Sequence, residues 1–301
     1  MAQQEAVAPT APTAPTAARR ARAGALRRLW RGQALLYLTI GVFLVLTFAP
    51  VAVMALLSFR DNAQIFTNFW GLPDPWLFSN YADAVGATLH YLVNSVGDTL
   101  AAVAITVVFS SLGGYVFARH RFPGKEALYV LILGLLMVPY VIQLVPAFVL
   151  THQLGIWNTP LALILPWAAG GQVLGIFLCR TFIASLPEEL FEAARIDGAG
   201  DLQLWSRVAV PLSWPILTTV AILSMVADYN DFIWPLLVIN DDNLQVVTVG
   251  LTQLDNATGS RMVNYGPDMA AYVVASVPLL IAFLFGMRHF VQGITSGAIK
   301  A

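Results

Sequence analysis

Long apolar runs, separated by short polar segments, dominate the pattern of the chain. Six of these runs are long enough for an α-helix to cross a bilayer, which takes about 20 residues. They lie near 34–59, 92–117, 127–150, 160–183, 209–239 and 269–290. The fifth run exceeds a simple span and contains Pro215 and Pro235, so we expect it to be tilted, kinked or broken. The pattern predicts an all-α integral membrane protein with six transmembrane helices.

Composition agrees with a membrane class. Hydrophobic residues make up 58% of the chain and charged residues 11%, against about 25% charged in soluble domains. The single cysteine, Cys179, excludes an internal disulfide, and we interpret it as a small apolar residue within a span. The chain has no basic patch interleaved with aromatic residues, so we expect no nucleic-acid partner.

The positions of the basic residues predict the orientation. All 16 Lys and Arg residues except Arg60 and Arg261 lie in the N-terminal tail or at the ends of the second, fourth and sixth runs. Cytoplasmic loops are enriched in Lys and Arg, so both termini are predicted to be cytoplasmic. We further expect residues 1–33 to form a disordered tail with a basic juxtamembrane segment, and residues 34–301 to form the membrane domain.

Two longer loops, near 60–91 and 240–268, fall on the external side in this topology. They are rich in aromatic residues, which are typical of the membrane interface. A docking surface for an external partner is the alternative. The residues concerned are Trp70, Trp76, Tyr81 and Tyr265.

The longest acid-rich segment, 185–201, separates the fourth and fifth runs. Ser185 and Glu188 have the spacing of a capping box at a helix start. Gly198 can adopt the left-handed conformation that ends a helix. Asp201 can then cap a second short helix over 202–208. The segment therefore predicts a polar helix–turn–helix, with an ordinary solvated loop as the alternative.

This segment also carries a spaced motif. Glu192-Ala193-Ala194 is followed by Gly198 after three intervening residues, by Val208 after nine more, and then by Pro211. It resembles the EAA signature of permeases in binding-protein-dependent ABC importers. The longer form Glu-Glu-Leu-x-Glu-Ala-Ala-x-Ile-Asp-Gly-Ala, which starts at Glu188, resembles the carbohydrate branch of that family, the maltose-transporter type. Shorter similarities extend the resemblance over about residues 34–301.

The resemblance implies a type I ABC importer permease fold, with a cytoplasmic coupling helix between the fourth and fifth helices and a coupling loop over 185–208. It implies a bacterial inner-membrane location, a second permease subunit, two cytoplasmic ATPase subunits, an external solute-binding protein and a carbohydrate substrate. The residues that it assigns to ATPase coupling are Glu188, Glu189, Glu192, Ala193, Ala194, Asp197 and Gly198.

Enzyme motifs are absent from the sequence. There is no Gly-x-x-x-x-Gly-Lys-Ser/Thr phosphate loop, no His-Glu-x-x-His and no cysteine pair. We therefore expect no catalytic residue, cofactor or metal in this chain, and we expect ATP and Mg²⁺ to be bound by partner subunits.

Polar residues inside the apolar runs are the candidates for a substrate path, because polar groups in hydrocarbon usually face a cavity or another helix. Sugar hydroxyls need carboxylate and amide partners, whereas hydrogen bonds between helices are the structural alternative. The candidates are Asn94, Asp98, Gln143, Asp228, Tyr229, Asn230 and Asp231.

The same carboxylates are also compatible with a second function, proton-coupled transport. In a proton-coupled secondary transporter, Asp98, Asp228 and Asp231 would form a proton relay. The signature segment and the lack of a visible internal repeat argue against this alternative.

Overall fold

A computed structural model describes residues 17–254 and 263–298. All the secondary-structure elements in these ranges are helices, joined by turns and irregular segments. The chain divides between Met54 and Ala55 into two compact units, Met1–Met54 and Ala55–Ala301. Helix α1, Ala17–Leu57, supplies the described part of the first unit with its residues 17–54. Its apolar stretch Leu36–Leu57 is long enough to cross a membrane. The predicted disorder at residues 1–16, and the positions of Arg261 and Lys300, lie outside the described residues.

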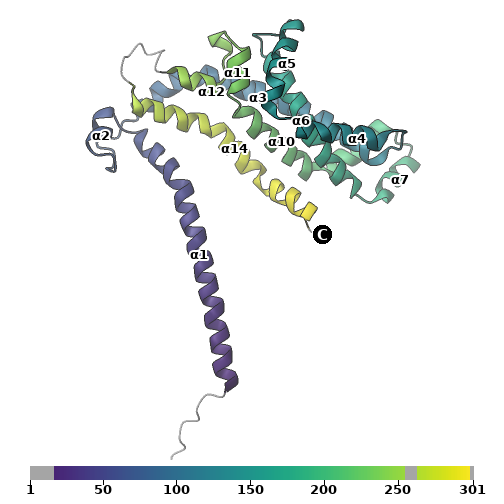
Figure 1. The fold of residues 1–301 in the computed structure, drawn as a ribbon, viewed down its shortest axis with the longest axis horizontal. Helices are drawn as coiled ribbons and strands as arrows, with labels where there is room; N and C mark the ends of the chain where they lie inside the picture. Colours follow the sequence, from purple (N-terminus) through teal and green to yellow (C-terminus); the bar gives the residue numbers. More distant parts are fainter. Residues whose placement is uncertain (1–16, 255–262, 299–301) are drawn as a thin grey trace, which may run out of the picture. The chain divides into compact units, whose positions relative to one another are not determined.

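The second unit contains the other helices (Figure 1). Those longer than one turn are α2 Asn62–Thr67, α3 Ser79–Arg119, α4 Lys125–Gly134, α5 Tyr140–Gln153, α6 Leu161–Ala184, α7 Glu188–Ile196, α10 Trp214–Tyr229, α11 Ile233–Val238 and α14 Tyr265–Ala298. The short helical segments are η1 Leu135–Met137, α8 Asp201–Leu204, η2 Trp205–Ala209, α9 Val210–Leu212, η3 Asp242–Leu244, α12 Val247–Gly250 and η4 Leu251–Gln253.

The described helices account for the six predicted spans. Four helices are long and apolar enough to cross a membrane, in α1, α3, α6 and α14, and two bent pairs bring the total to six if each pair is one span. The pairs are Lys125–Met137 with Tyr140–Gln153, bent by 103°, and Asp201–Leu212 with Trp214–Tyr229, bent by 80°. The predicted break in the fifth run is therefore confirmed.

The bend in the third run is a correction, since the apolar pattern over 127–150 predicts a continuous span. Pro139 causes it, because the residue before a proline is driven away from helical dihedral angles. Val138 has extended backbone (φ −83°, ψ 115°), and α5 starts at Tyr140 immediately after the proline. The second run also differs from its prediction, since α3 starts at Ser79, well before residue 92.

Helices α3 and α6 run in the same direction and pack closely through small residues. Side chains four residues apart on α3 (Thr106, Ser110) meet glycines four residues apart on α6 (Gly171, Gly175). One turn further along, Gly114 of α3 faces Cys179 of α6, and a Cβ atom at Gly114 would collide with it. Such pairs let two backbones approach inside a membrane. Cys179 is fully buried, as expected for a small apolar residue.

Candidate functional site

The acid-rich segment forms the predicted helix–turn–helix. Helix α7 covers Glu188–Ile196, and the turn after it contains Gly198 with φ +86°. The amide of Gly198 donates to the carbonyl of Arg195, and the amide of Ala199 to that of Ala194 (3.0 Å each). The left-handed residue at the end of the helix is therefore confirmed, and glycine adopts it without steric cost.

The start of this helix differs from the prediction. The hydroxyl of Ser185 donates to the carbonyl of Phe182 (2.8 Å), so it does not cap α7, and the capping box with Glu188 is wrong. The competing acceptor is a carbonyl at the end of α6, which lies only three residues back. Glu188 instead forms ion pairs with Arg119 and, at 3.6 Å, with Arg195.

The second short helix also differs in detail. Gly200 precedes α8, and its amide donates to the Gln203 side chain (3.2 Å), so Asp201 is the first helical residue and not the cap. The Asp201 carboxylate lies 3.9 Å from Nε2 of His120. Helix α8 ends at Leu204 and a π-helical turn, η2, follows it, where the pattern predicts one helix over 202–208.

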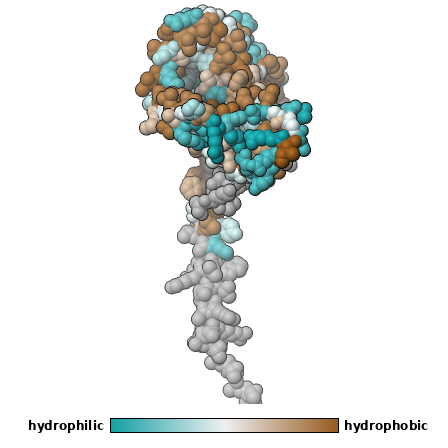
Figure 2. Space-filling model, turned by 90° about the vertical axis from the view of Figure 1, so that its right-hand side faces the viewer, coloured by the Kyte–Doolittle hydropathy of each residue, from teal (hydrophilic) through white to brown (hydrophobic). Residues whose placement is uncertain are grey.

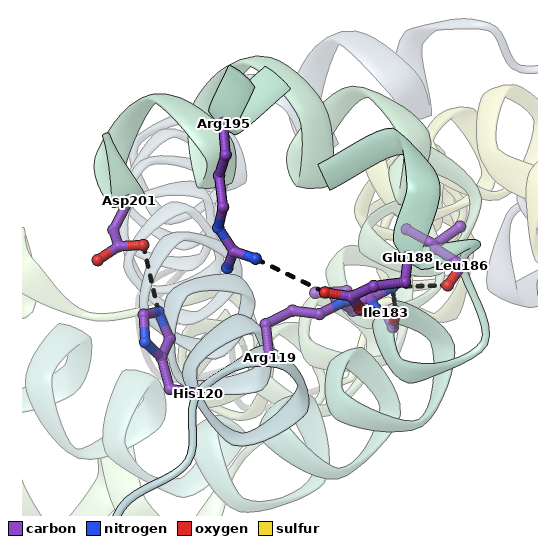
Figure 3. A network of polar contacts seen from close by, with 7 residues as sticks. All are labelled: Arg119, His120, Ile183, Leu186, Glu188, Arg195 and Asp201. Atoms are coloured by element: carbon purple, nitrogen blue, oxygen red, sulfur yellow. Dashed lines mark hydrogen bonds and ion pairs between the residues drawn. The ribbon is translucent and has the colours of Figure 1, made fainter. Parts of the chain in front are cut away.

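Arg119, the last residue of α3, holds α7 in place (Figure 3). One guanidinium nitrogen donates to the carbonyls of Ile183 and Leu186 (2.7 Å each), and the other pairs with Glu188. The carbonyls at the C-terminal end of a helix carry partial negative charge, so a cation is favourable there. The guanidinium also lies 4.1 Å from the centre of the Phe191 ring. A single residue thus joins α7 to the ends of α3 and α6.

Helix α7 has one buried and one exposed face. Phe191 is fully buried against Tyr115 and Ile183, together with residues of α8 and α10. The predicted coupling residues are largely open to solvent, including Glu188, although it is engaged in ion pairs. Glu189, Glu192, Ala193, Asp197 and Gly198 are exposed, and Ala194 is half-buried.

The exposed face is not only acidic. Three large apolar side chains of this segment are exposed, Leu190 (45%), Ile196 (86%) and Leu202 (69%). Figure 2 shows hydrophilic residues gathered over the end of the molecule that carries α7, interrupted by a hydrophobic patch. Exposed apolar side chains with a polar rim are typical of protein interaction surfaces. The sequence placed Leu190 on the apolar side of the helix with Phe191, whereas in the structure Leu190 is exposed and Phe191 is buried. Ile196 and Leu202 were not predicted to contribute to this surface.

The structure brings two of the candidate path residues together. Asp228 and Asp231 line one pocket, of ≈ 430 Å³, with Tyr140 and Trp167. Oδ2 of Asp231 accepts hydrogen bonds from Trp167 Nε1 (2.8 Å) and the Tyr140 hydroxyl (3.2 Å). No sequence signal indicates Tyr140 or Trp167, because their approach to Asp231 depends on the packing of α5 and α6 against α10.

The other candidates lie apart from that pocket. The Asn94 side chain donates to the carbonyls of Asn243 and Gln245 (2.7 and 3.0 Å), and the Tyr229 hydroxyl donates to that of Ala275 (2.7 Å). Both residues therefore join segments of the chain. Gln143 lines a second, mostly apolar pocket of ≈ 770 Å³ between α5 and α6.

The last two candidates for the substrate path, Asn230 and Asp98, line neither of these pockets. Asn230 is exposed, and its amide group donates to the carbonyl of Val226 (2.7 Å). Asp98 is half-buried on α3 and is absent from the described lining of both pockets.

Comparison with known proteins decides the family. Residues 110–296 match the family described as "Binding-protein-dependent transport system inner membrane component". The chain belongs to this family. The match includes α7, its turn and the pocket at Asp228, and it confirms the resemblance that the EAA-like motif indicated.

Individual relatives agree with this assignment. The chain is 34% identical to the probable ABC transporter permease protein YurM of Bacillus subtilis over 276 residues, 91% of each chain. It is 32% identical to the arabinooligosaccharides transport system permease protein AraQ of Halalkalibacterium halodurans, over 87% of this chain and 95% of the relative. The fold is similar to that in the crystal structure of a bacterial ABC transporter involved in the import of the acidic polysaccharide alginate. The TM-score is 0.74, with 21% identity over 88% of this chain and 97% of the other.

The protein is therefore a multi-pass membrane protein, and it is a transport subunit and not an enzyme. A permease of a binding-protein-dependent system works with other proteins, so the alternative of a proton-coupled carrier that acts alone is set aside.

Proposed function

We propose that this chain is one of two permease subunits of an ATP-driven importer, and that the complex carries a carbohydrate from an external solute-binding protein into the cytoplasm. ATP and Mg²⁺ are bound by two ATPase subunits, and this chain holds neither. Sugar cargo is supported by the carbohydrate-type form of the motif around Glu192 and by the arabinooligosaccharide relative.

The observation that carries the proposal is the two-sided structure of α7. Arg119 and Phe191 attach one side rigidly to the ends of α3 and α6, while the other side presents Glu189, Glu192 and Ile196 to solvent. A push on the exposed side is transmitted to the spans, because the attached side cannot move independently. This is what a helix that couples an ATPase to membrane helices must do.

The orientation follows from the same assignment. An ATPase works on the cytoplasmic side, so α7 and both termini are cytoplasmic, as the basic residues predict. Glu192 is suited to meet a cation on the ATPase, since charge-assisted hydrogen bonds fix both position and angle. Ala193 and Ala194 keep the helix narrow enough to enter a cleft, and Gly198 allows the turn into α8.

Two substitutions test the proposal in a complex co-expressed with its partner permease, ATPases and binding protein. Gly198→Val forces a branched residue to a φ of +86°, which costs about 1 kcal/mol or more. We expect normal membrane insertion but weaker ATPase co-purification, with Glu192→Ala causing a milder loss. Insertion, ATPase binding and sugar-dependent ATP hydrolysis should be measured on the same preparations. Full ATPase binding and full sugar-dependent ATP hydrolysis in both variants would show that the segment has no coupling role.

A further inference from the structure

The pocket of ≈ 430 Å³ lies between α6, α10 and the start of α5. Its wall is mostly apolar, with Tyr140, Trp167, Ser224, Asp228 and Asp231 as its hydrogen-bonding side chains. Small-ligand sites have this size and this mixture of apolar wall and a few polar groups. The pocket is therefore large enough for a ligand and has groups that can orient it.

Asp231 is held in a defined position on this wall. Its Oδ2 accepts from Trp167 and Tyr140, and its Oδ1 accepts from the backbone amide of Trp234 (3.3 Å). Its backbone carbonyl also accepts from the hydroxyl of Thr248 (2.7 Å). Three donors on one carboxylate hold it in a defined orientation at the pocket.

Asp228 is the contrasting case. It is only 8% exposed, and its Oδ2 has no hydrogen-bond partner within the described part of the chain. A buried polar atom without a partner is costly, and a carboxylate inside a membrane protein is more so. Since Asp228 lines the pocket, a ligand that enters it can supply the missing hydrogen.

The described lining carries no positive charge. It contains two carboxylates and no Lys, Arg or His. Like charges brought together in a low-dielectric site repel, and such repulsion is how a site rejects the wrong ligand. A ligand with a carboxylate of its own would meet this repulsion and would leave Asp228 without a donor.

We propose that this pocket is a substrate-contacting subsite of this subunit, which accepts a neutral or amino-bearing sugar unit and rejects a sugar unit that carries a carboxylate. The ligand donates a hydroxyl or ammonium hydrogen to Asp228, beside Asp231 as a fixed second acceptor. Tyr140, which is half-exposed, contributes part of the wall. The inference rests on the proposed function and adds the charge class of the cargo to it.

The test is direct binding to the complete permease–ATPase complex in lipid nanodiscs, with the binding protein left out. Three trisaccharides of equal length serve as probes, one neutral, one with amino groups and one made of uronates. Saturation-transfer NMR measures the binding of each probe to wild type and to Asp228→Asn. This substitution keeps the shape of the side chain and breaks no hydrogen bond of Oδ2 within the described chain. Asp83→Asn is the matched control, because Asp83 is exposed on α3 and outside the described pocket lining.

We expect the neutral and amino probes to bind wild type and the Asp83→Asn variant equally, and the uronate to bind neither. In Asp228→Asn the neutral probe should bind about tenfold more weakly, the size of effect expected for a lost charge-assisted hydrogen bond. The ratio of uronate to neutral binding should rise by a similar factor. The inference is overturned if the uronate binds wild type as well as the neutral probe, if no probe binds, or if Asp228→Asn behaves as wild type.

Failure of the proposed function gives a different result. If no loaded binding protein stimulates ATP hydrolysis by the wild-type complex, whatever the charge of its carbohydrate, the proposed function is wrong. If a loaded binding protein stimulates ATP hydrolysis, but Asp228→Asn binds the three probes as wild type does, only the subsite inference is wrong.

Discussion

Arg119 shows how one residue can determine the position of a functional helix. Its side chain is 7% exposed, and it donates to two carbonyls at the end of α6 and just beyond it, pairs with Glu188 and covers the ring of Phe191. The neighbouring Arg121 is exposed and makes none of these contacts in the described structure. Replacing each arginine in turn therefore shows whether the contacts of Arg119 hold α7, or whether any positive charge near this end of α3 does.

We predict that Arg119→Gln loosens α7 without preventing membrane insertion. Loss of the charged donors leaves the carbonyls of Ile183 and Leu186 short of partners, at a cost of about 2 kcal/mol or more in the docking of α7. Limited proteolysis of the segment 185–201 in membranes measures the effect, and cleavage should be at least tenfold faster. Arg121→Gln is the control and should cleave at the wild-type rate. Equal rates in the two variants would contradict the role assigned to Arg119.

Glu188 and Glu192 are predicted to act differently, although both belong to the same acid-rich helix. Both side chains are exposed, but Glu188 is paired with Arg119 and Arg195, whereas Glu192 has no ion-pair partner within the described part of the chain. Glu188→Gln should therefore increase proteolysis of the free permease, and Glu192→Gln should not. Both should reduce ATPase co-purification, which the same membranes can report. A protease effect from Glu192→Gln alone would reverse the assignment.

At the scale of elements, the pairing of α3 with α6 depends on close approach. Gly114 has Cys179 and the backbone of Arg180 directly opposite, so any side chain must push the two helices apart. Gly97, on the same helix, has open space at its Cβ position. The two glycines thus test packing against intrinsic helix propensity.

We predict that Gly114→Ala destabilises the folded permease by about 1–3 kcal/mol, the usual cost of overpacking a close contact. Gly97→Ala should be neutral or slightly stabilising, because alanine favours a helix more than glycine does. Thermal unfolding of the detergent-solubilised complex, followed by loss of its monodisperse size-exclusion peak, compares the two variants. An unchanged midpoint for Gly114→Ala would show that α3 and α6 can separate freely.

At the scale of the whole molecule, the prediction concerns topology. The basic residues and the proposed ATPase contact both predict that the segment 185–201 and the C-terminus are cytoplasmic. A reporter fused after Lys300 or inserted in 185–201 should therefore report a cytoplasmic position, and one inserted within 245–262 an external one. An external signal from 185–201 would contradict both the orientation and the coupling role of α7.

The sequence by itself determined the class of the protein, its apolar runs and the place of the polar helix–turn–helix between the fourth and fifth of them. Apolar runs of bilayer length leave few alternatives to helices, because backbone groups in lipid must bond within their own segment. The motif around Glu192 indicated the family, and Gly198 indicated the turn, since these depend on local chemistry and fixed spacing. The same local signals failed at Ser185, whose hydroxyl donates to a carbonyl of α6. They also failed at Asp201, because Gly200 precedes α8 and its amide donates to the Gln203 side chain.

Only the tertiary structure decided which polar residues face a pocket and which hold helices together. Asn94 and Tyr229 look as suitable for a sugar path in the sequence as Asp228 does, yet both bond to backbone carbonyls of other segments. Trp167 and Tyr140 reach Asp231 only because α5 turns by 103° at Pro139 and α6 packs beside α10. The physical reason is that the hydrogen-bond partners of a polar side chain between helices come from the helices packed against it. Those partners are far away in the sequence, so only the packing of the helices decides them.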